Sequence, residues 1–263
     1  KMAKSINIKK TISPFSKILK ISGDKSLSIR WALTASQANG KSKAYNLLMS
    51  EDILSTLKCL KKLGIKIKIK KKYCEINGLG LNGFKYKKNL ILNAGNSGTL
   101  GRLILGLLVK SPFKIKLIGD KSLSKRDFSR VIIPLKKFGA EFFPKNKSTL
   151  PILIKGSNTL KPINYYEKKG SAQCKSSIMY AALNVPGKTI IKAKKSRDHT
   201  EILFKNLNLP IKVKKEKNHD LIELEGKKNI KSFNYNIPSD ISSSAFFIVL
   251  TLLSKDSNLI IKN

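Results

Sequence analysis

The sequence has few acidic residues and very little arginine. Only 16 Asp and Glu residues stand against 53 Lys and Arg in 263 residues, which gives a formal net charge of +37. All but five of the basic residues are lysine. A guanidinium grips phosphate or carboxylate through a planar fork that an ammonium lacks. The five arginines are therefore the first candidates for binding an anionic ligand: Arg30, Arg102, Arg126, Arg130 and Arg197.

The sequence also lacks disulfide patterns, long apolar runs and a signal peptide. Cys59, Cys74 and Cys174 are isolated, without metal-ligand or disulfide spacing, and indicate buried or incidental thiols in a reducing compartment. No apolar run approaches the roughly 20 residues needed to span a bilayer. The first ten residues lack the apolar stretch of a signal peptide. We therefore expect a cytoplasmic protein without membrane contact.

The high positive charge raises the alternative of a nucleic-acid-binding protein. However, the lysines are spread over the whole length, and isoleucine and asparagine are abundant too, as in a composition set by biased nucleotide usage. No basic patch with interleaved aromatic residues is present. We expect no specific nucleic-acid partner, although such a chain should stick to polyanions in a salt-sensitive way. A non-catalytic polyanion-binding protein remains the alternative.

The chain repeats itself. GDKSLS occurs at residues 23–28 and again at 119–124, and LKKLGIKI at 60–67 is echoed at 135–142 and more loosely at 203–213. Each of these three segments predicts the end of an amphipathic helix, then a Gly or Asn suited to a left-handed helix cap, and then a strand. Helix followed by strand, three times, predicts an α/β domain built from repeated units.

Periodicity and turn residues locate the expected elements. We expect strands near residues 17–22, 65–69, 73–77, 89–93, 114–118, 150–154, 188–193, 210–214, 220–224 and 258–262. We expect helices near residues 28–38, 52–63, 99–110, 127–138, 171–184, 198–208 and 241–253.

Four arginine-containing segments lead into predicted helices and are rich in small polar residues: GDKSLSIR, GNSGTLGR, GDKSLSKR and KSRDHTE. The free N–H groups of a helix N-terminus favour an anion. In the first segment, Asp24 or Ser26 can cap a helix that begins near Ser28. Taken singly, the first segment is more typical of a capped surface helix than of a binding site. The second segment fits a binding site and an ordinary strand-to-helix turn about equally well.

A further segment, GSAQCKSS, adds candidates for binding a ligand. Ser171 and Gln173 suit substrate hydroxyls, and Lys175 suits an acid group. His199 is either an acid–base group or a capping and packing residue. No Ser-His-Asp arrangement, paired carboxylates or metal cluster stands out. The residues therefore predict a site that binds anions and has few proton carriers.

Six motifs stand in an order that identifies a resemblance: GDKSLSIR, LNAGNSGTLGR, GDKSLSKR, SAQCKS, SRDHTE and PSDISSSAFF. In this order they resemble the 5-enolpyruvylshikimate-3-phosphate synthase (3-phosphoshikimate 1-carboxyvinyltransferase) family. The SAQCKS and RDHTE forms are similar to the branch that includes glyphosate-tolerant bacterial enzymes. The resemblance covers essentially the whole chain but only about the N-terminal three-fifths of a family member.

The resemblance implies a fold of two similar domains, each built from repeated βαβαββ units. Residues 24–236 would be one complete domain, and residues 1–23 and 237–263 the edges of a second, truncated one. It implies an enzyme of chorismate and aromatic amino acid biosynthesis that transfers the enolpyruvyl group of phosphoenolpyruvate to shikimate 3-phosphate and releases phosphate. It also implies no metal, no organic cofactor and a monomer when complete.

The same resemblance assigns the site residue by residue. The expected shikimate 3-phosphate contacts are Lys25, Ser26, Arg30, Ser171, Ala172, Gln173 and Arg197. The expected phosphoenolpyruvate contacts are Lys25, Asn96, Gly98, Thr99, Arg102, Arg126 and Gln173. It gives no role to Arg130.

Two further expectations depend on the family. Its proton-transfer groups lie in the C-terminal part, so we expect the catalytic residues to be missing from this chain, which would be incomplete and inactive on its own. Glyphosate-tolerant members carry an extra methyl at the position of Gly98, so its absence predicts a glyphosate-sensitive enzyme. The sister enolpyruvyl transferase acting on UDP-N-acetylglucosamine is the nearest alternative, but nothing around the three cysteines resembles its reactive-cysteine loop.

Overall fold

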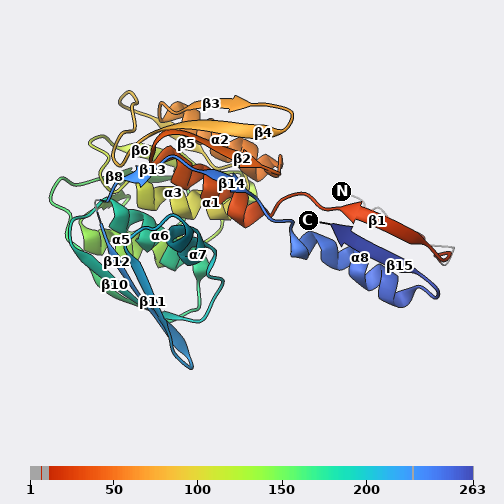
Figure 1. Ribbon diagram of the computed structural model, residues 1–263. Helices are drawn as coiled ribbons and strands as arrows, with labels where there is room; N and C mark the ends of the chain where they lie inside the picture. The colour runs from red at the N-terminus through yellow and green to blue at the C-terminus, as the bar shows by residue number, and fades with distance from the viewer. Residues whose placement is uncertain (1–6, 8–11, 227, 263) are drawn as a thin grey trace.

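The computed structural model describes residues 7, 12–226 and 228–262, which form a main body and a smaller lobe projecting from it (Figure 1). The main body contains three small β-sheets, and the lobe contains one helix and two paired strands. Within these ranges, no helix combines the length and the apolar character needed to cross a membrane.

Two sheets of the main body have the same strand order, β5-β6-β8-β7 and β9-β10-β12-β11. In each, the first two strands are parallel and the other pairs are antiparallel. One unit consists of β5 (Ile91–Asn93), α3 (Gly98–Leu107), β6 (Ile115–Ile118), α4 (Lys121–Ser124), α5 (Ser129–Phe138), β7 (Glu141–Phe143) and β8 (Ile152–Lys155). The other consists of β9 (Asn164–Glu167), α6 (Ala172–Leu183), β10 (Lys188–Lys194), α7 (His199–Asn206), β11 (Ile211–Lys215) and β12 (His219–Glu225).

The third sheet repeats this order as β13-β2-β4-β3, but its first strand comes from the far end of the main body. Both β13 (Ile230–Lys231) and β14 (Asn234–Asn236) lie parallel to β2, so they complete a unit that begins about 200 residues earlier. Three units of one topology confirm the α/β class and the repeats expected from the sequence. The other elements of this unit are α1 (Lys25–Ser36), β2 (Ala38–Tyr45), α2 (Glu51–Lys62), β3 (Lys66–Ile69) and β4 (Tyr73–Leu79).

The left-handed turns after α2, α5 and α7 confirm the helix-to-strand transitions expected from the echoes. The backbone takes a φ of 90° at Gly64, 114° at Gly139 and 53° at Asn208. Glycine and asparagine adopt this conformation at lower cost than other residues, so the helix ends there and the next strand turns back onto the sheet.

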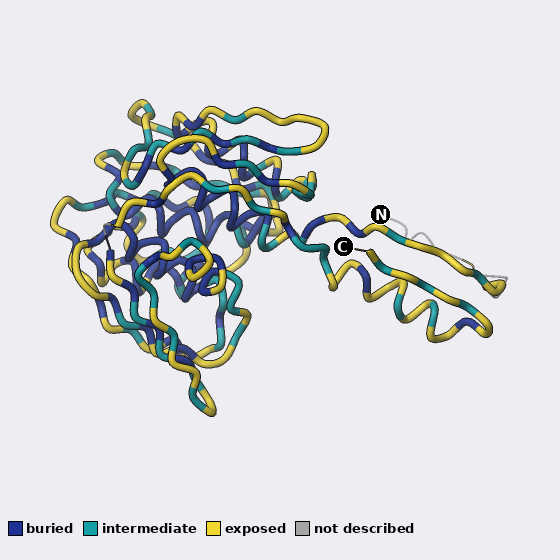
Figure 2. Tube along the Cα trace, viewed as in Figure 1, coloured by how far each residue is buried: buried dark blue, intermediate teal, exposed yellow. Residues whose placement is uncertain are grey.

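Helices α1, α3 and α6 form the centre of the main body. Most of their residues are buried on every side, and the three sheets lie outside them (Figure 2). Trp31 on α1 and Tyr180 on α6 are among the largest fully buried side chains. The Tyr180 hydroxyl lies 2.9 Å from the Thr34 hydroxyl and donates to the Arg30 carbonyl oxygen, which joins α6 to α1. These contacts fix the C-terminal half of α6 against α1.

The first helix begins earlier than expected. It begins at Lys25 rather than near Ser28, because Asp24 and not Ser26 is its N-cap and accepts from the Leu27 amide at 2.7 Å. The second GDKSLS copy folds in the same way, with Asp120 accepting from Leu123 at 2.7 Å at the start of α4. Besides α4, the elements outside the expected ranges are the strands β2, β7, β9, β13 and β14, of which β7 was predicted only by the repeat at residues 135–142.

The lobe consists of β1 (Ser16–Lys20), α8 (Ile241–Leu253) and β15 (Asn258–Lys262). Its two strands pair in parallel, from Ser16 opposite Asn258 to Lys20 opposite Lys262. Only Ser244 is buried among the residues of α8. The most exposed apolar side chains of this helix are Ile241 (72%), Phe246 (82%), Leu252 (80%) and Leu253 (80%).

Two chain segments cross between the lobe and the main body, and they bond to each other. The Asp24 amide donates to the Pro238 carbonyl oxygen at 2.8 Å, and the Asp240 amide donates to the Ser22 carbonyl oxygen at 3.0 Å. Gly23 lies in a bridge between these segments, where a Cβ atom would fall 2.0 Å from the Asn46 carbonyl oxygen. Only glycine allows this close approach.

Candidate anion-binding site

A pocket of about 540 Å³ lies where the N-terminal ends of the central helices meet. The helices α1, α3 and α6 each contribute residues from their first turns, and α5 and the start of α7 close the remaining side. Its lining consists of Lys25, Ser26, Arg30, Thr99, Arg130, Gly170, Ser171, Ala172, Gln173, Ser196, Arg197 and His199.

The ends of the three central helices share one geometry. Each has an N-cap side chain that accepts from an amide of the first turn: Asp24 in α1, Ser97 in α3 and Ser171 in α6. The positive ends of the three helix dipoles therefore point toward the same space, which favours a negatively charged ligand.

The charges of the lining reinforce this preference. Lys25, Arg30, Arg130 and Arg197 bring four cations, and no carboxylate occurs among the described lining residues. Lys25 has a counter-ion outside the pocket, Asp52, at 3.1 Å. Among the described residues, no carboxylate forms an ion pair with Arg30, Arg130 or Arg197, so the pocket suits a ligand that carries several negative charges.

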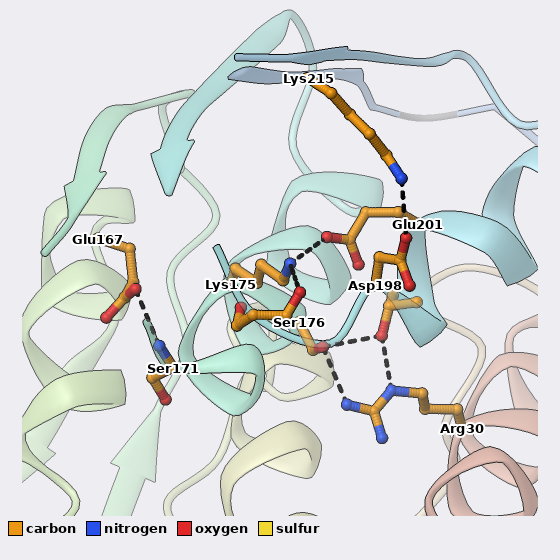
Figure 3. Close-up of polar contacts among 10 residues, drawn as sticks. Arg30, Glu167, Ser171, Lys175, Ser176, Asp198, Glu201 and Lys215 are labelled. Carbon is orange, nitrogen blue, oxygen red and sulfur yellow. Dashed lines mark hydrogen bonds and ion pairs between the residues drawn. The ribbon is translucent and has the colours of Figure 1, made fainter. Parts of the chain in front are cut away.

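Arg30 is the most constrained of these cations. Its side chain is held by acceptors from three helices. Nε donates to the Thr200 hydroxyl at 2.8 Å and Nη2 to the Ser176 hydroxyl at 3.2 Å (Figure 3), and Nη1 donates to the Ser26 carbonyl oxygen at 3.1 Å. These bonds use three of the five guanidinium N–H groups, which leaves two for a ligand. Burial lowers the pKa of Arg30, yet an arginine stays protonated near neutral pH.

A series of side-chain hydrogen bonds leads from the pocket toward the turn before α3. Gln173 donates to the Thr99 hydroxyl at 3.0 Å and accepts from Arg102 at 2.8 Å. Arg102 in turn lies beside Gly98, where an added Cβ would approach Arg102 Nη1 at 2.9 Å and Arg126 Nη1 at 3.3 Å. Two further guanidinium groups therefore converge next to the pocket.

Eight of the residues that the resemblance assigns to substrates line one pocket. They are Lys25, Ser26, Arg30, Thr99, Ser171, Ala172, Gln173 and Arg197. The other four do not line it. Arg102 donates to the lining residue Gln173 and Gly98 borders Arg102 and Arg126, whereas Asn96 donates to Asp120 at 2.5 Å.

The structure adds lining residues to which the resemblance assigned no substrate contact, chiefly Arg130, Ser196 and His199. Burial first, and then the neighbouring Arg30, lower the pKa of His199, so its ring is neutral near pH 7. Its Nδ1 atom is buried without a hydrogen-bond partner among the described residues. The scarcity of arginine was the one sequence signal that pointed to Arg130.

The expectation for Lys175 was wrong. Its side chain is fully buried and lies 2.5 Å from the Glu201 carboxylate, so it is an internal ion pair rather than a ligand for a substrate acid. Burial raises the pKa of Glu201, and the ammonium of Lys175 opposes this shift. Lys175 follows the lining residue Gln173 by two positions, which turns it to another face of α6.

The three cysteines are buried and free, as expected. Burial raises the pKa of Cys59 and Cys74 to about 11 and that of Cys174 to about 12, so all three are protonated thiols near neutral pH. None of them lines the anion pocket. The described pocket therefore contains no candidate for a nucleophilic cysteine.

Comparison with known proteins agrees with the motifs. The family described as EPSP synthase (3-phosphoshikimate 1-carboxyvinyltransferase) matches residues 9–263. A protein of that enzyme name from Streptococcus mutans is 39% identical over 260 residues, covering 98% of this chain and 60% of the relative. Another from Vesicomyosocius okutanii is 45% identical over 243 residues, covering 92% of this chain and 54% of the relative.

Solved structures agree on the fold. An EPSP synthase from Acinetobacter baumannii superposes with a TM-score of 0.84 at 35% identity, covering 95% of this chain and 56% of that protein. The chain thus spans little more than half the length of the relatives that it matches. The family match extends over nearly the whole sequence, and so the chain belongs to the EPSP synthase (3-phosphoshikimate 1-carboxyvinyltransferase) family.

Proposed function

We propose that this chain forms the shikimate 3-phosphate-binding part of an enzyme that transfers an enolpyruvyl group from phosphoenolpyruvate. In this reaction a hydroxyl oxygen of the acceptor forms a bond to the enol carbon and loses its proton, the bond from that carbon to the phosphate oxygen breaks, and the released phosphate takes up a proton in the overall balance. The observation that carries the proposal is the pocket itself, with four cations, three helix N-termini and no carboxylate among its described lining residues. Both proposed substrates carry a phosphate and a carboxylate, which match these features.

Following the resemblance, we infer two adjacent subsites, one in the pocket and one between the pocket and the turn before α3. Shikimate 3-phosphate would lie against the first turns of α1 and α6 and the loop before α7, held by Lys25, Ser26, Arg30, Ser171, Ala172, Gln173 and Arg197. Phosphoenolpyruvate would lie toward α3, near Lys25, Asn96, Gly98, Thr99, Arg102, Arg126 and Gln173. The hydrogen bonds from Thr99 through Gln173 to Arg102 support the adjacency of the two subsites, because they join the two groups of residues.

We further propose that residues 24–236 are one complete domain and that β1, α8 and β15 belong to the edge of a second. The closure of the first unit by β13 and β14 supports the first statement, and the exposed apolar face of α8 supports the second. The groups that move protons would then come from that second domain, because the described lining residues of the pocket include one imidazole, that of His199, and no carboxylate. A monomeric, cytoplasmic enzyme remains a prediction.

Two alternatives have less support. An enolpyruvyl transferase that relies on a reactive cysteine would need a thiol in the pocket, and the three cysteines are buried elsewhere. A general polyanion-binding protein needs only an open basic surface, which lysine supplies, and this alternative does not explain why arginine, the scarce cation, is concentrated around one concave site.

Calorimetric titration of residues 1–263 with shikimate 3-phosphate tests the proposal. We expect saturable binding that survives moderate salt, binding of shikimate too weak to detect, and roughly tenfold weaker binding by Arg197→Ala, because one charge-assisted contact is lost. DNA serves as the control polyanion. Equal loss of shikimate 3-phosphate and DNA binding as salt rises would instead identify a polyanion-binding protein.

A methyl group at Gly98 should change inhibition by glyphosate. In an active form of the enzyme, we expect glyphosate to inhibit the natural sequence and Gly98→Ala to relieve that inhibition. The physical reason is that the new Cβ would meet Arg102 Nη1 at 2.9 Å, so that guanidinium must shift. Inhibition constants and the KM for phosphoenolpyruvate, measured on both proteins, check this expectation. Equally potent inhibition of Gly98→Ala would contradict the steric explanation.

A further inference from the structure

Two neighbouring residues of α6 are joined to two neighbouring residues of α7 inside the main body. Lys175 Nζ lies 2.5 Å from Glu201 Oε1, and the Ser176 hydroxyl lies 2.8 Å from the Thr200 hydroxyl (Figure 3). All four side chains are buried, with Lys175 and Thr200 fully so. The start of α7 is thus fixed against the first turns of α6 by two polar contacts.

The ion pair also reaches the loop that carries a pocket cation. The ammonium of Lys175 donates to the Ser196 carbonyl oxygen at 3.4 Å. Ser196 and the next residue, Arg197, both line the pocket, whereas Lys175 and Glu201 do not. Arg197 itself is exposed, so its position depends on the backbone that holds it.

Stability alone is a poor explanation for this pair. Taking an ammonium and a carboxylate out of water costs several kcal/mol for each ion, and apolar residues of similar volume often stabilise a protein equally well. What an apolar pair lacks is a donor for the Ser196 carbonyl oxygen. The geometry therefore indicates a role in placing the loop.

We propose that the buried Lys175–Glu201 pair positions the Ser196–Arg197 segment of the anion pocket. Glu201 holds the ammonium in place from α7, and the ammonium holds the carbonyl oxygen that precedes Arg197. The pair acts through Arg197 and does not touch the ligand. The identity of the ligand rests on the function proposed above, but the positioning of the loop does not.

The test replaces both partners together in the full chain. Lys175→Met with Glu201→Gln removes both charges and leaves the net charge of the chain unchanged. A second double variant, Lys175→Gln with Glu201→Gln, keeps a polar contact between the helices but shortens the reach to Ser196. The matched control is Lys188→Met with Glu223→Gln, which removes a surface pair 3.2 Å apart on β10 and β12.

The first measurement needs no ligand. An arginine-specific protease should cut after Arg197 roughly tenfold faster in either double variant than in the natural chain or the control, because the loop opens more often. Cleavage after the exposed Arg126 is the internal reference and should not change. Unchanged cleavage after Arg197 in a folded double variant would overturn the proposal, and equal acceleration at both sites would show general destabilisation instead.

The second measurement is the affinity for shikimate 3-phosphate. We expect a loss of roughly tenfold in the double variants with no loss in the control, since a displaced contact residue weakens binding. If the natural chain does not bind shikimate 3-phosphate, the proposed function fails while the protease comparison still decides the positioning role. If the natural chain binds and folded double variants bind equally well, the positioning role fails and the proposed function stands.

Discussion

Replacing Arg30 by lysine should weaken the binding of shikimate 3-phosphate about 100-fold, although the charge is kept. The guanidinium is held by Thr200, Ser26 and Ser176 and still has two free N–H groups. An ammonium cannot make these three contacts and also present a fork to a phosphate. Loss of two charge-assisted hydrogen bonds at the lower end of their usual range, about 1.5 kcal/mol each and so about 3 kcal/mol together, gives an effect of this size.

Titration calorimetry and thermal unfolding of Arg30→Lys would separate binding from folding. Arg126→Lys is the matched control for this ligand, because Arg126 is exposed and does not line the pocket. We expect Arg126→Lys to bind shikimate 3-phosphate like the natural chain. Unchanged affinity in a folded Arg30→Lys protein would show that this guanidinium does not contact the phosphorylated ligand.

Residues 1–263 should self-associate through α8, and polar substitutions there should abolish the association. Phe246, Leu252 and Leu253 are each at least 80% exposed on a helix of which only Ser244 is buried. A contiguous apolar surface of this kind promotes association in water. We expect the triple variant Phe246→Ser, Leu252→Ser, Leu253→Ser to sediment as a monomer at concentrations where the natural chain does not.

Sedimentation velocity over a range of concentrations measures this effect. The control variant, Ile133→Ser with Ile202→Ser, removes exposed apolar side chains from the main body instead and should associate like the natural chain. A natural chain that stays monomeric throughout, or a triple variant that associates as strongly as the control, would contradict the expectation.

Local sequence patterns predicted most of the fold because the repeats are local. An amphipathic helix, a residue suited to positive φ and a strand follow one another within each echo, and each part has its own signal. The strands β2 and β9 have no such signal, because ANGKSKAY and NYYE place few large apolar residues in alternation. The pairing of β13 and β14 with β2 joins segments about 190 residues apart, which no local pattern reveals.

The site could be predicted in part from the scarcity of arginine. Arg30, Arg130 and Arg197 line the pocket, Arg102 bonds to the lining residue Gln173, and Arg126 lies near Gly98 beside Arg102. Composition thus predicted a common location, even for Arg130, to which the family resemblance gave no role. Lys175 was misplaced because sequence shows that a residue lies on a helix but not whether its face meets a pocket or a neighbouring helix.

The paired crossing between lobe and main body has a mechanical consequence. Two connecting segments without mutual contacts would leave the lobe free to move relative to the main body. Here the two segments are hydrogen-bonded to each other around Gly23. Asp24 belongs to this crossing through its amide and caps α1 through its carboxylate. A rotation of the lobe about this crossing would therefore act first on the residue directly before Lys25, which lines the pocket.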